Sequence, residues 1–435
     1  MTSHLNRRRF LQTTAASSAV LATGVWSEVS AQDSDSPNEK LNIGIIGVNG
    51  RGRANINGVR NENIVSLCDI NDLSLGTARE RFPAATHYSD WRRMIENEKT
   101  LDAYVISTTS HTHAPAAVKA MRMGKHVYCE KPLAHTVQEA RIMREVFRET
   151  GVATQMGTQI HAGNTFRRVV EMVQAGAIGP VREAHVWCNR TSRPGDRPAG
   201  TQPIPDHLHW DLWLGPAPER PYHGSYLPGN LTWNRWWDFG NGTLGDMGSH
   251  LIDLPWWALE LEAPVSAEAE GPAVHPETYP AWLIVTWQHP ANDWHGEITL
   301  KWYHGGRRPD SPDGINLGQW GNGIMFVGDE GQLVADYGKW KLLPADKFAD
   351  YEPPEQTIAA SPGHYNEWIR GCKEGTPTLC NFDYSGALIE NNLLGNVAFR
   401  MGQRLDWNSE ELAVTNCDEA EPLIRKEYRE GWRIL

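Results

Sequence analysis

The sequence predicts an α/β protein in two parts: a doubly wound parallel sheet, followed by an α+β part with a large open, mostly antiparallel sheet. Three observations predict this fold. A glycine-rich turn follows the first apolar strand, and strands and helices alternate from there to residue 155. Beyond residue 160, long Pro- and Gly-rich loops separate strands that alternate imperfectly. Regular β–α alternation is typical of a parallel sheet, whereas strands joined by loops indicate antiparallel pairing.

The glycine-rich turn lies between two apolar runs, residues 42–46 and residues 64–68, and the second run ends in Asp69. In this layout the turn and the following helix N-terminus bind a pyrophosphate, and the acid binds an adenosine ribose. We therefore expect five turn residues to contact a dinucleotide: Gly47, Asn49, Gly50, Arg51 and Gly52. Asn49 departs from the usual pattern because it occupies the middle glycine position. An ordinary tight turn is the alternative interpretation.

The residues after Asp69 indicate which dinucleotide binds. Asp69 is followed by Ile70 and Asn71, and no Arg or Lys stands close enough in sequence to hold a 2′-phosphate. A carboxylate without a cationic neighbour accepts hydrogen bonds from a ribose but repels a phosphate. The sequence therefore favours NAD over NADP as the cofactor.

The alternating elements predict a Rossmann domain over residues 41–158, after a lead-in. The expected helices are 72–82, 114–123 and 135–150, and the expected strands are 102–106, 125–129 and 152–155. Ligands of parallel sheets bind at the carboxyl ends of the strands. Ser107 and His113 follow one strand, and Glu130 and Lys131 follow the next, so we expect all four side chains to face the cofactor.

Residues 159–435 are expected to form the second domain, which binds substrate. The first helix spans 164–175, and the late helices span 361–373 and 383–402. Strands are expected near residues 181–190, 264–271, 280–288, 296–303, 323–327 and 332–336.

The first 31 residues resemble a twin-arginine export signal. Arg7, Arg8 and Arg9 precede a mildly apolar run, and a small-residue cleavage site ends at Ala31. Residues 32–40 look like a disordered lead-in, and a chance basic N-terminus is the alternative interpretation. The signal predicts a periplasmic or otherwise extracytoplasmic protein without membrane insertion after cleavage. Because free nicotinamide cofactor is scarce there, we expect the protein to retain its NAD.

Charge and cysteine content narrow the functional classes. Residues 1–31 carry a net charge of +2 (Arg7, Arg8, Arg9 and Glu28), so their removal changes the formal charge from −12 to −14. An acidic chain repels nucleic acid and anionic lipid and suits a soluble enzyme with a neutral substrate. The six cysteines have no close metal-type spacing, so we expect no metal site. Cys372 and Cys380 are expected as free thiols, with a disulfide between them as the alternative.

Three features carry the expected chemistry. Lys131 follows a Rossmann strand and precedes Pro132, which makes a cis peptide bond plausible. Asp246 and His250 stand four residues apart at the start of a probable helix, so they share one face, and the carboxylate is expected to orient the imidazole. A helix-start acid beside a structural histidine is the alternative interpretation of this pair.

The third feature is an aromatic run just before that helix. Tryptophan faces beside polar groups suit a sugar ring, with its apolar C–H faces and polar rim. The candidate substrate-binding residues are Trp233, Arg235, Trp236 and Trp237, together with His250. A core or oligomer-interface cluster explains the tryptophans equally well. His207 and His209, close to Trp210, are expected to be pocket or structural residues rather than a metal pair.

The chain resembles the Gfo/Idh/MocA oxidoreductase family over nearly all of residues 40–435. The resemblance rests on Glu-Lys-Pro at 130–132 and Gly-Asp-Met-Gly-Ser-His at 245–250. It is similar in particular to an exported branch with Trp-Asp-Leu-Trp-Leu-Gly-Pro at 210–216 and Tyr-Arg-x-Gly-Trp at 428–432.

The resemblance implies roles for individual residues. Lys131 would polarise the reacting oxygen, His250 would exchange its proton, and Asp246 would orient His250. His113 and Asn189 would be lesser contacts to cofactor or substrate. The open sheet would mediate a homodimer or homotetramer.

Three functions compete at this stage. The first is an NAD-dependent oxidoreductase that transfers hydride between a sugar ring carbon and the nicotinamide. The second is a redox-neutral glycosidase, lyase or epimerase that oxidises its sugar transiently; the glycosidases of the family are expected to carry a different segment at 246–250. The third is a non-catalytic sugar-binding protein, against which Lys131, Asp246 and His250 argue.

Overall fold

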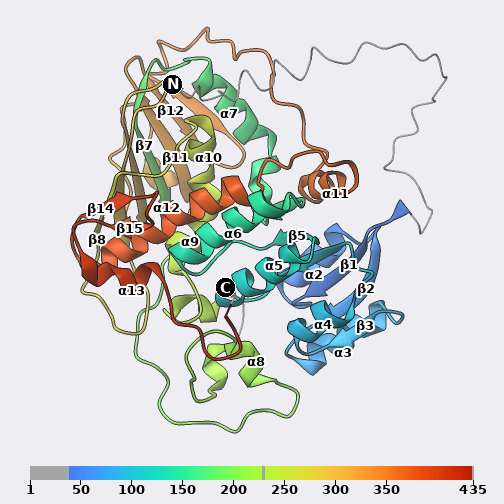
Figure 1. The fold of residues 1–435 in the computed structure, drawn as a ribbon. Coiled ribbons are helices and arrows are strands. Elements are labelled where there is room, and N and C mark those ends of the chain that lie inside the picture. Colours follow the sequence, from blue (N-terminus) through green and yellow to red (C-terminus); the bar gives the residue numbers. More distant parts are fainter. Residues whose placement is uncertain (1–38, 228–230, 434–435) are drawn as a thin grey trace, which may run out of the picture. The chain divides into compact units, whose positions relative to one another are not determined.

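The computed structural model describes residues 39–227 and 231–433, and the chain from Lys40 onward forms one compact unit (Figure 1). The predicted export signal, 1–31, lies outside the described residues, as does nearly all of the predicted lead-in, 32–40. No helix in the described ranges is long and apolar enough to cross a membrane.

A six-stranded parallel sheet forms the N-terminal part, in the order β3-β2-β1-β4-β5-β6. Its strands are β1 (Asn42–Ile46), β2 (Asn63–Cys68), β3 (Thr86–Tyr88), β4 (Ala103–Ile106), β5 (His126–Cys129) and β6 (Thr154–Met156). The helices between them are α2 (Arg51–Gly58), α3 (Asp72–Arg81), α4 (Trp91–Asn97), α5 (His113–Arg122) and α6 (Val137–Thr150). The strand order reverses direction between β1 and β4. The loops after these two strands therefore diverge and leave a crevice, the usual ligand position in such sheets.

A nine-stranded sheet forms the C-terminal part, in the order β13-β12-β11-β7-β10-β9-β8-β14-β15. Only β7 and β10 pair in parallel; the other neighbours are antiparallel. The strands are β7 (Val181–Cys188), β8 (Ser266–Glu270), β9 (Leu283–His289), β10 (Ile298–His304), β11 (Asn322–Gly328), β12 (Gln332–Ala335), β13 (Trp340–Leu343), β14 (Leu405–Asn408) and β15 (Ala413–Val414). The predicted fold class, a Rossmann sheet plus an open, mostly antiparallel sheet, is confirmed.

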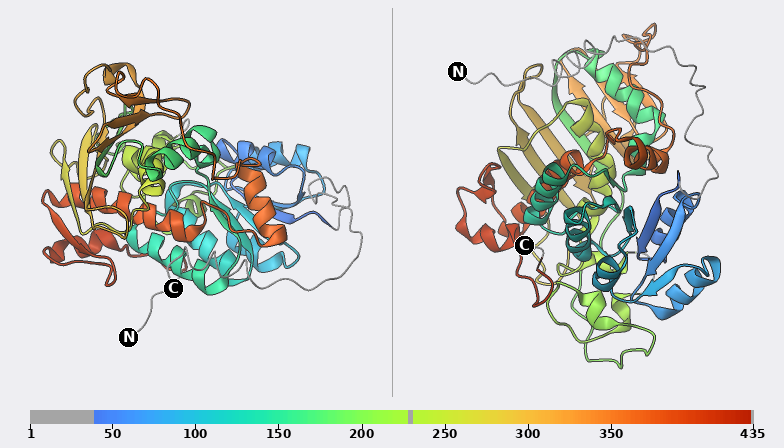
Figure 2. Two further views of the ribbon diagram at one scale, coloured as in Figure 1. Left: turned by 90° about the horizontal axis from the view of Figure 1, so that it is seen from above. Right: turned by 45° about the vertical axis from the view of Figure 1, so that its right-hand side comes forward.

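Helices cover one face of the nine-stranded sheet (Figures 1 and 2). The helices of this part are α7 (Asn164–Gln174), α8 (Trp210–Leu214), α9 (Gly242–Leu251), α10 (Asp253–Ala258), α11 (His364–Glu374), α12 (Phe382–Met401) and α13 (Glu421–Ile424). Helices α9, α10 and α12 contact the strands directly.

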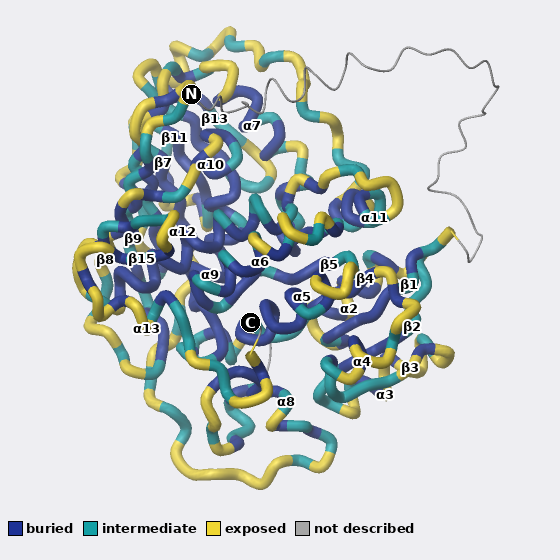
Figure 3. Tube along the Cα trace, in the orientation of Figure 1, coloured by how far each residue is buried: buried dark blue, intermediate teal, exposed yellow. Residues whose placement is uncertain are grey.

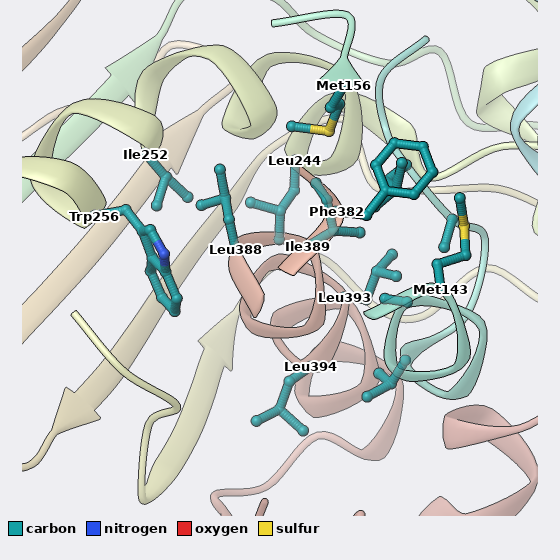
Figure 4. Packing of buried hydrophobic residues seen from close by; sticks show 14 of the residues in the cluster. Met143, Met156, Leu244, Ile252, Trp256, Phe382, Leu388, Ile389, Leu393 and Leu394 are labelled. Atoms are coloured by element: carbon teal, nitrogen blue, oxygen red, sulfur yellow. The ribbon is translucent and has the colours of Figure 1, made fainter. Parts of the chain in front are cut away.

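Helix α12 joins the two sheets into one core. Three quarters of its length is buried, and its buried positions run round most of the helix (Figure 3). Its apolar side chains are directed at Met143 of α6 and at Leu244 of α9, which belong to the same buried cluster (Figure 4). A helix buried on nearly all sides fixes its neighbours with respect to one another. Because α6 follows β5 of the first sheet, α12 ties α9 to the carboxyl edge of the Rossmann sheet.

All six cysteines are free thiols in the structure. Cys380 is buried and Cys372 is half-buried. The alternative of a disulfide between these two residues is therefore not realised.

Buried histidines predict acid sensitivity. Burial lowers the pKa of His111 to about 3 and the pKa of His289 and His304 to about 4. The unfolded chain, with its ordinary histidine pKa, binds more protons than the folded chain between pH 6.5 and pH 4. The free energy of unfolding should therefore fall as the pH falls through this window, by about 2 kcal/mol per group at pH 5.

Denaturant unfolding at pH 7.5 and pH 5 measures this effect. The variant His289→Asn keeps a donor for the Glu262 carbonyl, which lies 2.8 Å from Nδ1, but it cannot be protonated. It should lose less stability between the two pH values than the parent protein, by about 2 kcal/mol. An equal loss in both proteins would show that His289 is not the source.

Candidate active site

The turn after β1 requires glycine at two positions because backbones approach closely there. Gly47 has φ +87°, and its N–H donates to the Cys68 carbonyl at 2.8 Å. A Cβ on Gly52 would lie 2.0 Å from the Gly47 carbonyl oxygen. Helix α2 begins at Arg51 without a side-chain cap, so its first N–H groups have no side-chain acceptor at the N-cap. The Gly52 N–H donates to the Asn49 carbonyl at 2.9 Å. N–H groups at a helix N-terminus without a side-chain acceptor fit a pyrophosphate.

Asp69 lies beside this turn. One carboxylate oxygen accepts the Val48 N–H and the other accepts the Asn71 N–H, both at 2.9 Å. Burial raises the pKa of Asp69, and these hydrogen bonds oppose that rise. Asp69 lines the same cavity as the turn, as a ribose contact requires. Turn and carboxylate together fit a dinucleotide.

One cavity of about 830 Å³ joins the Rossmann edge to the second sheet. Most predicted residues line it: Gly47, Asn49, Gly50, Arg51, Asp69, Ser107, Glu130, Lys131, Trp233, Asp246 and His250. Gly52 does not line the cavity, but its close approach to the Gly47 carbonyl shapes the turn. The volume lies in the range of small-molecule and cofactor sites.

Glu130 organises the loop after β5 from a buried position. Its Oε1 accepts from Arg51 Nε at 2.9 Å, from Asn55 Nδ2 at 3.0 Å and from Gln159 Nε2 at 3.2 Å. The charge of Glu130 is therefore neutralised by Arg51. The Glu130 carboxylate holds the loop next to Lys131 in place, and the Lys131 ammonium pairs with a different carboxylate.

That partner is Asp246, on α9. Lys131, which precedes a cis bond to Pro132, donates from Nζ to Asp246 Oδ1. Arg190, after β7, donates to Asp246 Oδ2 at 3.0 Å. Burial opposes ionisation of Asp246, but the charge of Lys131 outweighs it, and the pKa of Asp246 lies below its ordinary value. One buried carboxylate thus holds two cations at the cavity wall.

His250 stands one helical turn after Asp246, yet the predicted hydrogen bond between them is absent from the described structure. That prediction is corrected, because Lys131 and Arg190 occupy the two carboxylate oxygens. The Nδ1 atom of His250 is buried without a hydrogen-bond partner. Burial, reinforced by the charge of Lys131, lowers its pKa to about 3, so the imidazole is neutral at physiological pH. A neutral imidazole on the cavity wall can accept a proton.

The structure places the other sugar-binding candidates away from the cavity. Trp236 is fully buried in an aromatic cluster, and Arg235 stacks on its ring at 4.4 Å. Trp237 packs against Tyr279, with ring centroids 3.8 Å apart. Asn189 accepts from Arg308 at 3.4 Å and does not line the cavity. Of the aromatic run, Trp233 remains as a wall residue.

The remaining histidines have structural surroundings. The ring nitrogens of His113 lie 2.8 Å from the Pro132 carbonyl and 3.0 Å from the Thr108 carbonyl, so His113 braces the two loops. His209 Nε2 lies 3.1 Å from Asp72. Within the described ranges, no group of three or more His, Cys, Asp or Glu side chains is arranged to hold a metal ion.

Several residues that line the cavity are not among the candidates predicted from the sequence: Gln159, Arg190, Trp213, Leu231, Asn234 and Tyr337. Arg190 carried a usable signal, because it is the last residue of a predicted strand, 181–190. Tyr337 lies in the turn between β12 and β13, and nothing in its neighbourhood of the sequence indicates that the turn reaches this cavity.

Replacing Gly52 with alanine tests the turn. The added Cβ would collide with the Gly47 carbonyl, and the turn would have to move. We expect NAD to bind about 100-fold more weakly, the equivalent of one lost strong hydrogen bond to a charged group. Gly76→Ala is the control, because its Cβ would point into open space on α3. Equal affinities of the two variants in an NAD titration would contradict the assignment of the turn.

The glycine turn, Asp69 and the adjoining Lys131 form a site of the Rossmann dinucleotide-binding type. The chain belongs to the Gfo/Idh/MocA oxidoreductase family: residues 41–158 match its NAD-binding Rossmann fold, and residues 181–297 match its C-terminal alpha/beta domain. NAD is the cofactor of this class.

Known relatives are similar to parts of the chain. Levoglucosan dehydrogenase of Pseudarthrobacter phenanthrenivorans is 28% identical over 115 residues, which cover 26% of this chain and 29% of that protein. Glycosyl hydrolase family 109 protein 1 of a Shewanella species is 28% identical over 152 residues, covering 32% and 33%. The chain thus spans about a third of each of these relatives.

A similar fold is found in the WlbA dehydrogenase from Bordetella pertussis, solved in complex with NADH and UDP-GlcNAcA. Its TM-score is 0.60 with 17% sequence identity, over 85% of this chain and 99% of that chain. The likeness supports the fold.

Proposed function

We propose that this protein transfers hydride between a carbohydrate ring carbon and bound NAD, with Lys131 and His250 acting on the reacting oxygen. The observation that carries this proposal is the meeting of Lys131, Asp246 and His250 in the cavity that also contains the glycine turn. The named activity of the levoglucosan relative supports a carbohydrate as the substrate class.

NAD, when bound, supplies the hydride acceptor. The chain's own residues handle the proton and the charge. The Lys131 ammonium stabilises negative charge on the substrate oxygen, and the neutral imidazole of His250 accepts the hydroxyl proton. Asp246 holds Lys131 at the cavity wall. In the reverse direction His250 returns the proton and Lys131 polarises the carbonyl.

A redox-neutral cycle is the second candidate, favoured by the similarity to a glycosyl hydrolase and by the segment around Leu208, which lines the same cavity as Asp69. The Asp72 N–H donates to the His207 carbonyl, and the His209 N–H donates to the Ile70 carbonyl, both at 2.9 Å. This backbone pairing, just after Asp69, supports retention of the cofactor between turnovers. We also propose export by the twin-arginine route and assembly into a homodimer or homotetramer.

Quantifying NAD released on denaturation tests these proposals. The protein is matured in its export compartment, purified and denatured. Stoichiometric NAD that does not exchange with added NAD would favour the redox-neutral cycle, and substrates would be screened for glycoside hydrolysis. A protein that releases no NAD but reduces added NAD in the presence of a sugar would favour an ordinary dehydrogenase. A protein that releases no NAD on denaturation and also does not bind added NAD would overturn the proposed function.

A further inference from the structure

Arg190 lines the cavity. One nitrogen donates to Asp246 at 3.0 Å, and the side chain is 59% exposed. The Arg190 carbonyl accepts the Gly305 N–H at 3.0 Å, which ties this backbone to the end of β10. Arg190 is therefore a cation that Asp246 holds in place near Lys131. Its other guanidinium N–H groups have no carboxylate partner in the described structure.

The positive and negative charges around Lys131 and Arg190 do not balance. Asp246 is the single carboxylate for both Lys131 and Arg190. His250 is neutral, and Glu130 is already paired with Arg51. The part of the cavity formed by Lys131 and Arg190 therefore carries one uncompensated positive charge. Such a site favours a substrate that brings a negative charge.

A second donor is available on the same wall. The Tyr337 hydroxyl is buried beside the Asn322 side chain, and Tyr337 lines the cavity. Burial raises the pKa of Tyr337, so the hydroxyl stays protonated and can donate. A protonated phenol hydroxyl can donate one hydrogen bond to an oxygen of a ligand.

We propose that Arg190, assisted by Tyr337, binds a carboxylate of the substrate, which makes the substrate a sugar acid rather than a neutral sugar. The planar guanidinium fork matches two oxygens of a carboxylate. The inference rests on the proposed function and specifies the substrate class of the same site. It assigns Arg190 a role in specificity, while Lys131 and His250 act on the reacting hydroxyl.

The test compares matched sugars on the NAD-loaded protein. Binding is measured by calorimetry for glucose, galactose and mannose and for the three corresponding uronates, with NADH formation followed in parallel. At least one uronate should bind about tenfold or more tightly than its parent sugar, the contribution of one charge-assisted pair. Glucose 6-phosphate is included because a phosphate would use the same cation.

Arg190→Gln should remove that preference while changing the affinity for neutral sugars about twofold or less. Arg193→Gln is the matched control, since Arg193 is exposed in the same loop but does not line the cavity. Arg190→Lys should restore part of the preference. The inference is overturned if neutral sugars bind as tightly as uronates, if glucose 6-phosphate binds best, if no uronate binds, or if Arg190→Gln weakens both classes equally.

The two proposals fail separately. NADH formation with neutral sugars alone would leave the hydride-transfer function standing and refute the role of Arg190. Uronate binding that depends on Arg190, without NADH formation or sugar turnover, would support the carboxylate site and refute the proposed function.

Discussion

Replacing Lys131 with methionine is expected to lower kcat by about 10³-fold, within the range for loss of a group that stabilises transition-state charge. Methionine keeps most of the length of the side chain but not the ammonium. The turn at Gly47 and the carboxylate of Asp69 are untouched, so NAD should still bind with about its original affinity, because the cofactor interactions that these groups supply are unchanged. Steady-state kinetics together with an NAD titration measure both quantities.

Lys119→Met is the matched control. Lys119 lies on α5, pairs with Glu96 on the surface and does not line the cavity. Its loss should leave kcat unchanged. If Lys131→Met also leaves kcat unchanged, the site is assigned wrongly. If the parent protein binds sugar and NAD but turns over neither, the protein is a binding protein, and the substitution would alter binding alone.

The fold could be predicted because its elements carry local signals. The strands of the first sheet are short apolar runs, and helix α6 begins with a Thr136–Glu139 capping box. The elements missed are short or depend on distant partners. Strand β3 has three residues and no apolar pattern, and β15 has two. Such strands form because a neighbouring strand offers hydrogen bonds, which no local pattern records.

The site could be predicted only in part, for a similar reason. Lys131 and the glycine turn follow strands, so the topology alone places them at one edge. The partner of Asp246 depends on how α9 packs against the loop after β5, and helical spacing pointed to His250 instead. Trp236 likewise lies in a run whose composition is typical of sugar-binding sites, but it is buried with Phe239 in an aromatic cluster. Composition did not distinguish a core from a binding surface.

Replacing Asp246 with asparagine is expected to reduce both kcat and stability. The substitution leaves the charges of Lys131 and Arg190 beside each other without a carboxylate. Breaking a buried ion pair in this way costs about 3 kcal/mol or more in the free energy of unfolding. The displaced Lys131 should lower kcat by about 10²-fold. Denaturant unfolding and steady-state kinetics measure the two effects.

A double-mutant comparison shows through which residue Asp246 acts. If Asp246 holds Lys131, as the structure indicates, then Asp246→Asn should cost much less stability in the Lys131→Met background, with a coupling of about 1–3 kcal/mol. In a His250→Gln background the cost should stay nearly as large as in the parent protein, because Asp246 and His250 share no hydrogen bond. The reverse pattern would restore the carboxylate–imidazole pair that helical spacing predicted. The two cycles therefore decide between two roles for Asp246 on α9. It forms a catalytic dyad with His250, or it positions Lys131 while His250 acts as an independent, neutral base.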